Sequence, residues 1–177
     1  MRFLLLPLLL AATAPAVAQS KKPPQPARGE AASGAARKLG DFEDWIAAIH
    51  KESGQNVCYA FVRAKNSVPA LPGRGEVVLT VTERPTLRDT VAISAGFPYR
   101  KDATVSMQVD TAGIDFYTAQ SSAFARDGRA AVAAFQKGGQ ALARSPGPRD
   151  GQVIVDTFSL RGFSGAYAEI NKACPPK

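Results

Sequence analysis

The chain has 177 residues, enough for one globular domain, and its formal net charge is +7. Hydrophobic residues make up 45% and charged residues 21%, a balance that is typical of a soluble domain and excludes collagen-like and fully disordered chains. Two cysteines are too few for a four-thiolate zinc site or a disulfide-dense scaffold, and the single histidine, His50, is too few for a multi-histidine metal centre.

The first residues have the layout of a secretory signal peptide. A basic start at Arg2 is followed by the apolar run 3–10, and Ala16-Val17-Ala18 places small residues at a cleavage site. We predict cleavage before Gln19, so that residues 1–18 are removed and the protein is periplasmic or secreted. The alternative is a retained membrane anchor. The apolar run is about half of the ~20 residues that a spanning helix needs, so we expect no transmembrane segment in the mature chain.

Residues 19–38 are predicted to be a disordered linker. They contain Pro, Ala, Gly, Ser and charged residues but no large apolar side chain that could offset the entropy of ordering. Six of the 22 basic residues but only one of the 15 acidic residues precede Leu39, so residues 39–177 carry 16 basic against 14 acidic side chains. A folded basic face for nucleic acid is therefore not expected. The linker itself is either a solvated tether or a contact for anionic lipid or polysaccharide.

Short apolar segments separated by turn residues predict an antiparallel β domain from residue 39 onward. Residues 42–49 and 57–62, separated by the turn cluster 51–56, are expected to form a hairpin; a helix over 42–50 is the alternative, because Ala47-Ala48 favours it. Four further strands are predicted by β-branched residues bounded by Gly, Pro or Asp, at residues 76–82, 90–95, 104–109 and 114–117.

Two helices and a last strand are predicted in the C-terminal third. Asp127 is placed to cap a helix over 129–137, and residues 152–158 form a strand. Ser159 is placed to cap a final helix that should bury one apolar stripe against the sheet. The stripe consists of Leu160, Phe163, Tyr167, Ile170 and Cys174.

The two cysteines of an exported chain are predicted to form one disulfide, Cys58–Cys174. A loop of this length stabilises a fold by about 4–5 kcal/mol in the chain-entropy model. The alternative is a redox-active thiol pair. The spacing is not Cys-x-x-Cys, and both cysteines have apolar neighbours that do not lower a thiol pKa.

Catalytic motifs are not found in the sequence. His50-Lys51-Glu52 is not the His-Glu-x-x-His of zinc proteases, and 162–165 lacks the Gly-x-Ser-x-Gly spacing of a nucleophile elbow. A triad would have to use His50 with Asp41 or Asp44, and no nucleophile is marked. Glu43, Asp44 and Glu52 could form an acid/base pair, but a solvated acidic face is favoured. We expect no enzyme activity, catalytic residue, cofactor or metal.

Candidate ligand contacts are aromatic and basic side chains near strand ends. Those singled out are Trp45, Arg63, Tyr99, Arg100 and Tyr117. Core packing is the favoured role for Trp45, and for the aromatic cluster Phe97, Tyr99, Phe116, Tyr117 and Phe124, where a ligand groove is the alternative. Scattered surface charge is the favoured interpretation, with an anion-binding rim as the alternative, for the basic residues Arg63, Lys65, Arg74, Arg84, Arg88, Arg100 and Lys101.

Several of these features together resemble the invasion-associated locus B family of proteobacterial exported proteins. The resemblance covers about residues 40–175 and rests on Phe42-x-x-Trp45, the cysteine on the next strand, and a terminal Ser159-Leu160-x-Gly162-Phe163-x-x-Ala166 segment that continues to Cys174. Glu43-Asp44-Trp45 stands where the family tends to have Gly-Asp-Trp, and an additional early cysteine is absent, as in a divergent or shortened member. The resemblance implies an exported, mostly β domain without an established enzymatic site.

We therefore predict an α+β, mainly β, single domain over 39–177. It is expected to be an antiparallel β-sandwich or curved sheet of about seven strands, with two short helices, the last one C-terminal. The predicted function is non-enzymatic binding of an envelope component or another protein in the bacterial envelope. The alternatives are a carboxylate-dependent hydrolase or lyase acting on cell-wall material and a periplasmic small-molecule carrier.

Overall fold

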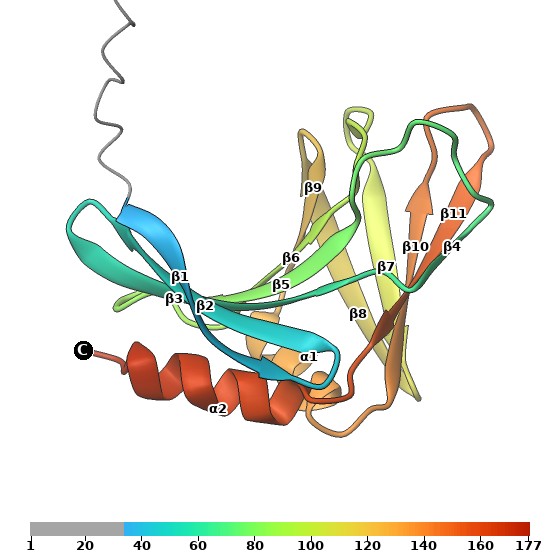
Figure 1. Cartoon of the computed structure of the whole chain (residues 1–177). Coiled ribbons are helices and arrows are strands. Elements are labelled where there is room, and N and C mark those ends of the chain that lie inside the picture. The colour runs from blue at the N-terminus through green and yellow to red at the C-terminus, as the bar shows by residue number, and fades with distance from the viewer. Residues whose placement is uncertain (1–33) are drawn as a thin grey trace, which may run out of the picture. The chain divides into compact units, whose positions relative to one another are not determined.

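The computed structural model describes residues 34–177 and contains one antiparallel sheet and two helices (Figure 1). The helices are α1 (Gly128–Phe135) and α2 (Phe163–Ala173). The eleven strands are β1 (Gly34–Phe42), β2 (Trp45–Glu52), β3 (Gln55–Arg63), β4 (Asn66–Val68), β5 (Val78–Glu83), β6 (Thr90–Ser94), β7 (Thr104–Val109), β8 (Ala112–Ala119), β9 (Ser122–Ala125), β10 (Gln140–Pro146) and β11 (Val153–Ser159). The mainly β class and the C-terminal helix are confirmed, whereas the predicted number of strands was too low.

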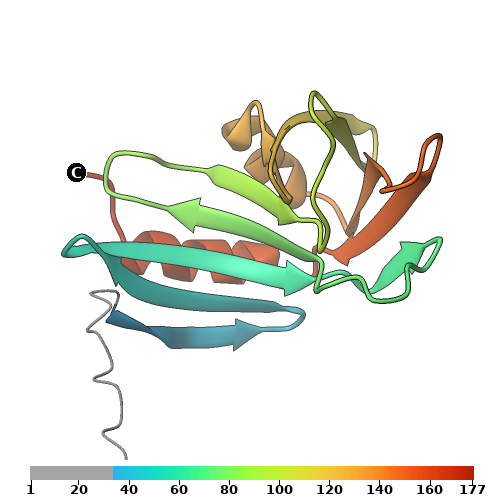
Figure 2. The ribbon, with the colours of Figure 1, turned by 90° about the horizontal axis from the view of Figure 1, so that it is seen from above.

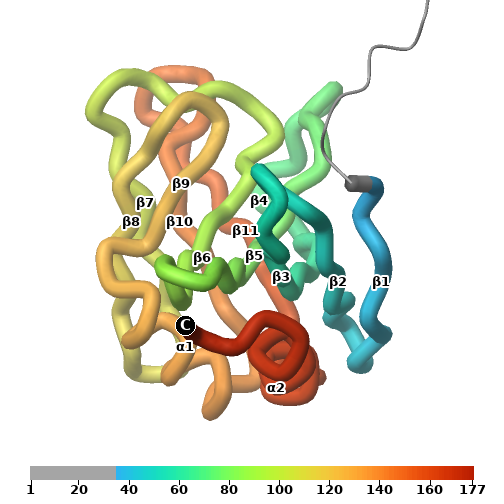
Figure 3. The backbone as a smooth tube through the Cα atoms, turned by 90° about the vertical axis from the view of Figure 1, so that its left-hand side faces the viewer, coloured from blue at the N-terminus to red at the C-terminus, as the bar shows by residue number. Residues whose placement is uncertain are grey.

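The sheet has the strand order β1-β2-β3-β5-β6-β9-β8-β7-β10-β11-β4. Its last strand, β4, follows β3 after only Ala64 and Lys65, and the Lys65 amide donates to the Thr157 carbonyl of β11 at 2.8 Å. The far edge of the sheet therefore curls back to the continuation of β3 (Figure 3). Strands β1, β2, β3, β5 and β6 lie side by side in front of α2 (Figure 2).

The core lies inside the curl and between the sheet and the two helices. Alternate residues of the strands face it. In β7, for example, Val105, Met107 and Val109 are buried and the residues between them are exposed. Helix α2 packs against β1, β2, β3 and β5, and α1 packs against β6 and β8. The largest fully buried aromatic side chains are Trp45, Phe116, Phe135, Phe158 and Phe163. Neither helix in residues 34–177 is long and apolar enough to cross a membrane.

Four strands were not predicted, namely β1, β4, β9 and β10. Strand β1 begins at Gly34, so residues 34–38, which the composition assigns to the linker, pair with β2 instead. Consecutive strands do not all pair with each other, because β9 lies between β6 and β8, and β7 pairs with β10 as well as with β8. The predicted strand over 42–49 is confirmed as β2 and the helix alternative is wrong, although β2 begins only at Trp45, after a turn in which Glu43 has φ of 51°. The predicted signal peptide and the rest of the linker lie outside the described residues.

Of the two predicted helix caps, the one at the start of α1 is confirmed and the one at the start of α2 is wrong. The Asp127 carboxylate accepts from the Ala130 amide at 2.9 Å and caps α1. Ser159 does not cap α2, which begins only at Phe163 after Gly162 in the left-handed conformation. The Ser159 hydroxyl instead donates to the Asp44 carboxylate at 2.5 Å, tying the start of the final helical segment to the β1–β2 turn.

The predicted disulfide is present. Cys58 on β3 is bonded to Cys174, which directly follows α2, and their Cα atoms are 5.9 Å apart. Both residues are buried. The predicted stripe of α2 also faces the sheet, with Leu160, Phe163 and Ile170 buried beside Cys174. The bond closes a 116-residue span and holds the C-terminal helix against β3.

Candidate functional site

The five predicted ligand contacts do not form one site. Trp45 is fully buried on the core side of β2, and its indole N–H donates to the Ser159 carbonyl at 2.9 Å. Its ring lies 4.8 Å from that of Phe163. Trp45 is therefore a core residue. Arg63 and Tyr117 are at the surface but on β3 and β8, which are separated in the sheet by β5, β6 and β9.

Tyr99 and Arg100 lie together on the loop between β6 and β7. Tyr99 is half-buried, and this burial raises its pKa to about 12. Arg100 forms an ion pair with Asp150 of the β10–β11 loop. The Tyr99 amide donates to the Gln120 carbonyl of the β8–β9 turn at 2.8 Å, so both residues link neighbouring loops, and neither of these contacts includes Tyr117.

The basic side chains considered as an anion-binding rim are mostly paired with carboxylates of the chain itself. Six of its seven members form ion pairs, so their positive charge is already balanced. These pairs are Arg63–Glu76, Lys65–Asp44, Arg74–Asp156, Arg84–Glu52, Arg88–Glu83 and Arg100–Asp150. The interpretation as an anion rim is therefore not supported, and the seventh member, Lys101, is an exposed loop residue.

The candidate acid/base carboxylates are each paired with a different cation. Asp44 accepts from Ser159 and lies 2.9 Å from the Lys65 ammonium, and these two contacts lower its pKa. Glu43 pairs with Arg161, and Glu52 pairs with Arg84. Within residues 34–177, no group of three or more His, Cys, Asp or Glu residues is arranged to hold a metal ion.

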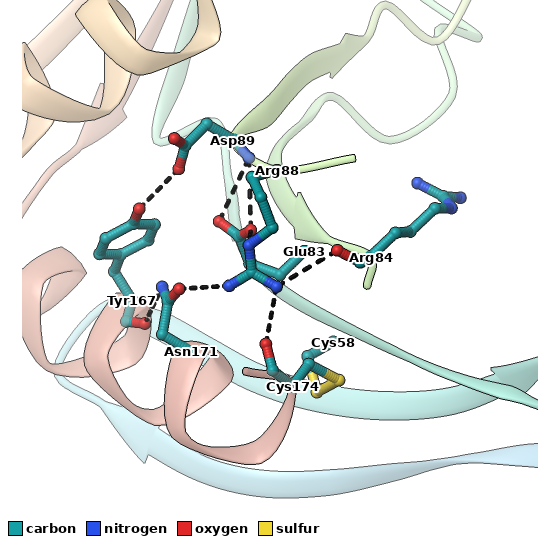
Figure 4. A network of polar contacts seen from close by, with 8 residues as sticks. All are labelled: Cys58, Glu83, Arg84, Arg88, Asp89, Tyr167, Asn171 and Cys174. Atoms are coloured by element: carbon teal, nitrogen blue, oxygen red, sulfur yellow. Dashed lines mark hydrogen bonds and ion pairs between the residues drawn. A yellow bond between two sulfur atoms is a disulfide. The ribbon is translucent and has the colours of Figure 1, made fainter. Parts of the chain in front are cut away.

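A buried polar network near the disulfide was not predicted (Figure 4). The Glu83 side chain is fully buried and lies 2.7 Å from Nε of Arg88. Arg88 also donates to the Cys174 carbonyl at 2.7 Å and to the Asn171 side chain. Tyr167 donates to Asp89 at 2.5 Å. Because its members bind one another and the ends of β5, β6 and α2, the network is a structural link between the helix and the sheet.

Burial shifts the pKa values of two groups in this network. Desolvation raises the pKa of Glu83 to about 7, although the Arg88 guanidinium acts in the opposite direction. Burial and the hydrogen bond to Asp89 raise the pKa of Tyr167 to about 12. Glu83 has no exposed surface, so its titration concerns the stability of the fold and not contact with a ligand.

The outward side chains of β7–β10 form the best candidate for a binding surface, which we call the β8 wall. Alternation along β8 buries Ile114 and Phe116 and exposes Asp115 and Tyr117. The neighbouring strands add residues on the same face by direct pairing, and Arg126 directly follows β9. The β8 wall consists of Thr104, Ser106, Asp115, Tyr117, Phe124, Arg126 and Arg144.

One row of the β8 wall carries a pair of aromatic rings. Tyr117 pairs with Phe124 on β9, and the two rings are stacked with centroids 5.6 Å apart and an angle of 26° between their planes. Tyr117 is 46% exposed, which is unusual for a large side chain of this domain. The Arg126 guanidinium lies 5.8 Å from the Tyr117 ring centroid, within cation–π distance. The row therefore offers the exposed Tyr117 ring as an apolar platform beside a cation.

The next row of the β8 wall is polar and consists of four neighbouring residues, one each from β8, β7 and β10 and one that follows β9. The Arg126 amide donates to the Asp115 carbonyl at 2.9 Å, Asp115 pairs with Ser106, and Ser106 pairs with Arg144. These residues line a surface hollow of about 300 Å³, whose floor is formed by the strand backbones around Val105 and Phe116. The hollow and the ring platform are thus side by side on strands that hydrogen bonding holds in register.

The two arginines of the β8 wall differ from those of the predicted rim. Within the part of the chain that the structure describes, neither Arg126 nor Arg144 has a carboxylate oxygen within 4.0 Å. Asp115 is the acidic member of the hollow. Two guanidinium groups against one carboxylate leave the hollow with a net charge of +1, so the surface can accept one anionic group.

A second hollow of about 340 Å³ lies at the loops that follow β4, β6 and β10. Its lining includes Arg74, Phe97 and Arg149. The Arg74 guanidinium is buried and bonded to both Asp156 oxygens, to Ser67 and to the Ala95 carbonyl. Because its donors are almost all used, Arg74 fastens the loop and has little capacity left for a ligand.

The architecture defines the class of the protein: a curled antiparallel sheet whose C-terminal helix is fastened to β3 by a disulfide. The same fold is found in the crystal structure of invasion associated protein B from Bartonella henselae. The match has a TM-score of 0.58 at 17% sequence identity and covers 77% of this chain and 96% of that chain. The resemblance to invasion-associated locus B proteins is therefore confirmed for the fold. No protein-family model and no curated protein matches the chain significantly.

Proposed function

We propose that the protein is an exported, non-enzymatic binding protein that recognises a component of the bacterial envelope, or a protein within it, through the β8 wall. The observation that carries this proposal is the exposed Tyr117 ring, stacked on the half-buried Phe124, near two arginines that have no carboxylate partner among residues 34–177. An exposed aromatic platform with neighbouring charge is the usual composition of a recognition surface.

The rigidity of the strands supports recognition at this place. Strands β7, β8 and β9 each have a hydrogen-bonded neighbour on both sides, so the side chains of the β8 wall are held at fixed spacing. A site on strands is placed more precisely than a site on loops. The carboxylates considered for acid/base chemistry are engaged in separate ion pairs, which favours binding over catalysis as the proposal.

We also propose that the protein is located in the periplasm or is secreted. A disulfide that joins β3 to the C-terminal segment fits an oxidising environment such as the periplasm or the exterior of the cell. The name of the Bartonella protein refers to invasion, but a fold can be shared by proteins of different function. We therefore take from that likeness only the expectation of an exported binding module.

The proposal is tested by cosedimentation of the purified mature chain with isolated envelope membranes and cell-wall sacculi. The double variant Tyr117→Ala/Arg126→Ala should lose most of the bound fraction. The matched control is Arg63→Ala, because Arg63 also lies over an aromatic ring, that of Phe61, at 5.7 Å but on β3. Equal sedimentation of all three proteins would overturn the β8 wall as the binding surface.

The non-enzymatic part is tested in the same samples. Mass spectrometry of the supernatant should show no soluble glycan or peptide fragment that accumulates with time above the amount released without protein. Fragments that accumulate with the wild type and disappear with Asp44→Asn would identify an enzyme and overturn this part of the proposal.

A further inference from the structure

We infer that the β8 wall binds an acidic saccharide, a sugar chain carrying a single anionic group where it contacts the hollow. This inference rests on the proposed function and names the class of ligand for the same surface. It is drawn from three properties of the wall, namely its stacked rings, its net charge and the hydrogen-bonding groups between its arginines.

The exposed Tyr117 ring provides an apolar surface. Tyr117 and Phe124 are stacked at 26° and partly cover one another, and Tyr117 is the more accessible of the two, at 46% exposed. The C–H face of a pyranose ring is flat and weakly apolar, and it can lie on such a platform while its hydroxyl groups remain directed outward. Tyrosine suits this position because its ring is apolar and its hydroxyl stays in water.

The arginines select for an anion. Arg126 and Arg144 line the same hollow and carry planar guanidinium groups, which bind carboxylates and phosphates through two parallel hydrogen bonds. Asp115 between them reduces the net charge to +1 and repels a densely charged polyanion. The charge of the hollow therefore fits one anionic group and disfavours a nucleic acid backbone.

The remaining groups of the hollow suit hydroxyl-rich ligands. Thr104 and Ser106 line it beside Asp115, so it offers two hydroxyls and a carboxylate at neighbouring positions. A carboxylate only accepts hydrogen bonds, whereas a hydroxyl both donates and accepts. Sugar hydroxyls supply both functions, and a simple fatty acid supplies neither beyond its head group.

The sheet topology argues against an extended peptide that adds a strand. Such peptides bind through the free backbone groups of an edge strand. Strand β7 is paired with β8 and β10, and β8 is paired with β7 and β9. The backbone of the β8 wall is already hydrogen-bonded, so its ligand has to be recognised by side chains alone.

The inference is tested by isothermal titration calorimetry of the mature chain with defined oligosaccharides at low salt. The probes are an oligosaccharide that carries one uronic acid residue, its carboxyl-reduced neutral counterpart, and an oligomannose of similar length that carries one phosphate group. Binding of either acidic probe supports the inference and shows whether the anion is a carboxylate or a phosphate. The neutral counterpart should bind at least about tenfold more weakly, because it lacks the charge-assisted hydrogen bonds to the guanidinium groups.

The variants separate the rings from the charges. Arg126→Ala and Arg144→Ala should each weaken the acidic probe by about tenfold or more and leave the residual binding of the neutral probe unchanged. Tyr117→Ala should weaken both probes, whereas the control Arg63→Ala should change neither. Circular dichroism shows whether each variant is folded.

Three results would overturn the inference. The first is equal affinity for the acidic and neutral probes, and the second is displacement of the acidic probe by acetate or inorganic phosphate at the same concentration, which would indicate a site for a small anion only. The third is absence of binding to all probes. If the variants still abolish envelope cosedimentation in that case, the proposed function stands and only the ligand class is wrong; if cosedimentation is unaffected, both fail.

Discussion

Arg88 lies 2.7 Å from the buried carboxylate of Glu83 and at the same time donates to the carbonyl of Cys174. One guanidinium therefore joins the end of β5 to the residue that forms the disulfide. A buried ion pair is costly unless its remaining groups are satisfied. Here the Arg84 and Cys174 carbonyls and the Asn171 side chain accept from Arg88, and the Asp89 amide contacts the Glu83 oxygens at 3.3 and 3.4 Å.

Burial of Glu83 predicts that the free energy of unfolding falls as the pH rises from about 5 to about 7. The pKa of this carboxyl is about 7 in the folded chain, against a usual value of 4.5. Between these values the folded state holds a proton that the unfolded state has released, so stability is greatest below the unfolded pKa and levels off above the folded pKa. A difference of this size corresponds to about 3 kcal/mol. Urea denaturation at pH 5, 6, 7 and 8 measures the free energy of unfolding across this range.

The control for this prediction is Glu83→Gln, which keeps the size of the side chain and cannot titrate. Its stability should vary much less between pH 5 and pH 7 than that of the wild type. A wild-type stability that rises over this interval, or a variant with the same slope as the wild type, would show that the Arg88 guanidinium keeps the carboxyl ionised.

Loss of the disulfide should strongly destabilise the chain. Cys58 and Cys174 close a span of 116 residues, and the chain-entropy model gives about 4–5 kcal/mol for a loop of this length. The variant Cys58→Ala/Cys174→Ala should lose an amount of this order in urea denaturation, compared with the oxidised wild type. A loss below about 1 kcal/mol would mean that the packing of α2 and the Arg88 network hold the C-terminus without the bond.

The sequence allowed prediction of those elements whose side chains carry a strong local pattern. Strand β5 is rich in β-branched residues, and α2 presents an apolar stripe with helical spacing. Strand β10 was not predicted, because its inward residues Ala141, Ala143 and Ser145 are small. Small residues have no strong preference for a strand, so their sequence carries no strand pattern. Residues 34–38 of β1 have no large apolar side chain, and this part of the strand is held by its pairing with β2.

The candidate site was predictable only in part for a related reason. Tyr117 could be singled out as an aromatic residue, and period-two alternation in β8 places Asp115 on the same face. Arg126 and Arg144 join them only because β9 and β10 flank β8 and β7 in the sheet. That order depends on long-range pairing, which local residue patterns do not encode. The arginines that were chosen instead lie beside carboxylates distant in sequence, as Arg74 lies beside Asp156.

Gly162 is predicted to be irreplaceable at the start of α2. Its φ is +85°, and an added Cβ would lie 1.9 Å from the Phe42 carbonyl oxygen. Gly162→Ala should therefore destabilise the chain by more than about 2 kcal/mol, because both the backbone conformation and the close approach are incompatible with a side chain. The matched control is Gly113→Ala on β8, where an added Cβ meets nothing within 4 Å. Thermal unfolding followed by circular dichroism should show a loss only for Gly162→Ala; similar melting temperatures for the two variants would contradict the prediction.

Trp45 is predicted to act on stability and not on ligand binding. Its indole is fully buried, donates to the Ser159 carbonyl at 2.9 Å and packs on Phe163. Trp45→Phe removes the donor, leaves that carbonyl without its indole partner and leaves unfilled volume, so it should cost about 2–4 kcal/mol. Urea denaturation measures this loss, and titration with the acidic oligosaccharide measures binding under conditions where the variant is folded. The affinity should equal that of the wild type, because Trp45 faces the core and the β8 wall faces solvent. A variant that keeps its stability but loses the oligosaccharide would show that the ligand reaches the core side of β2.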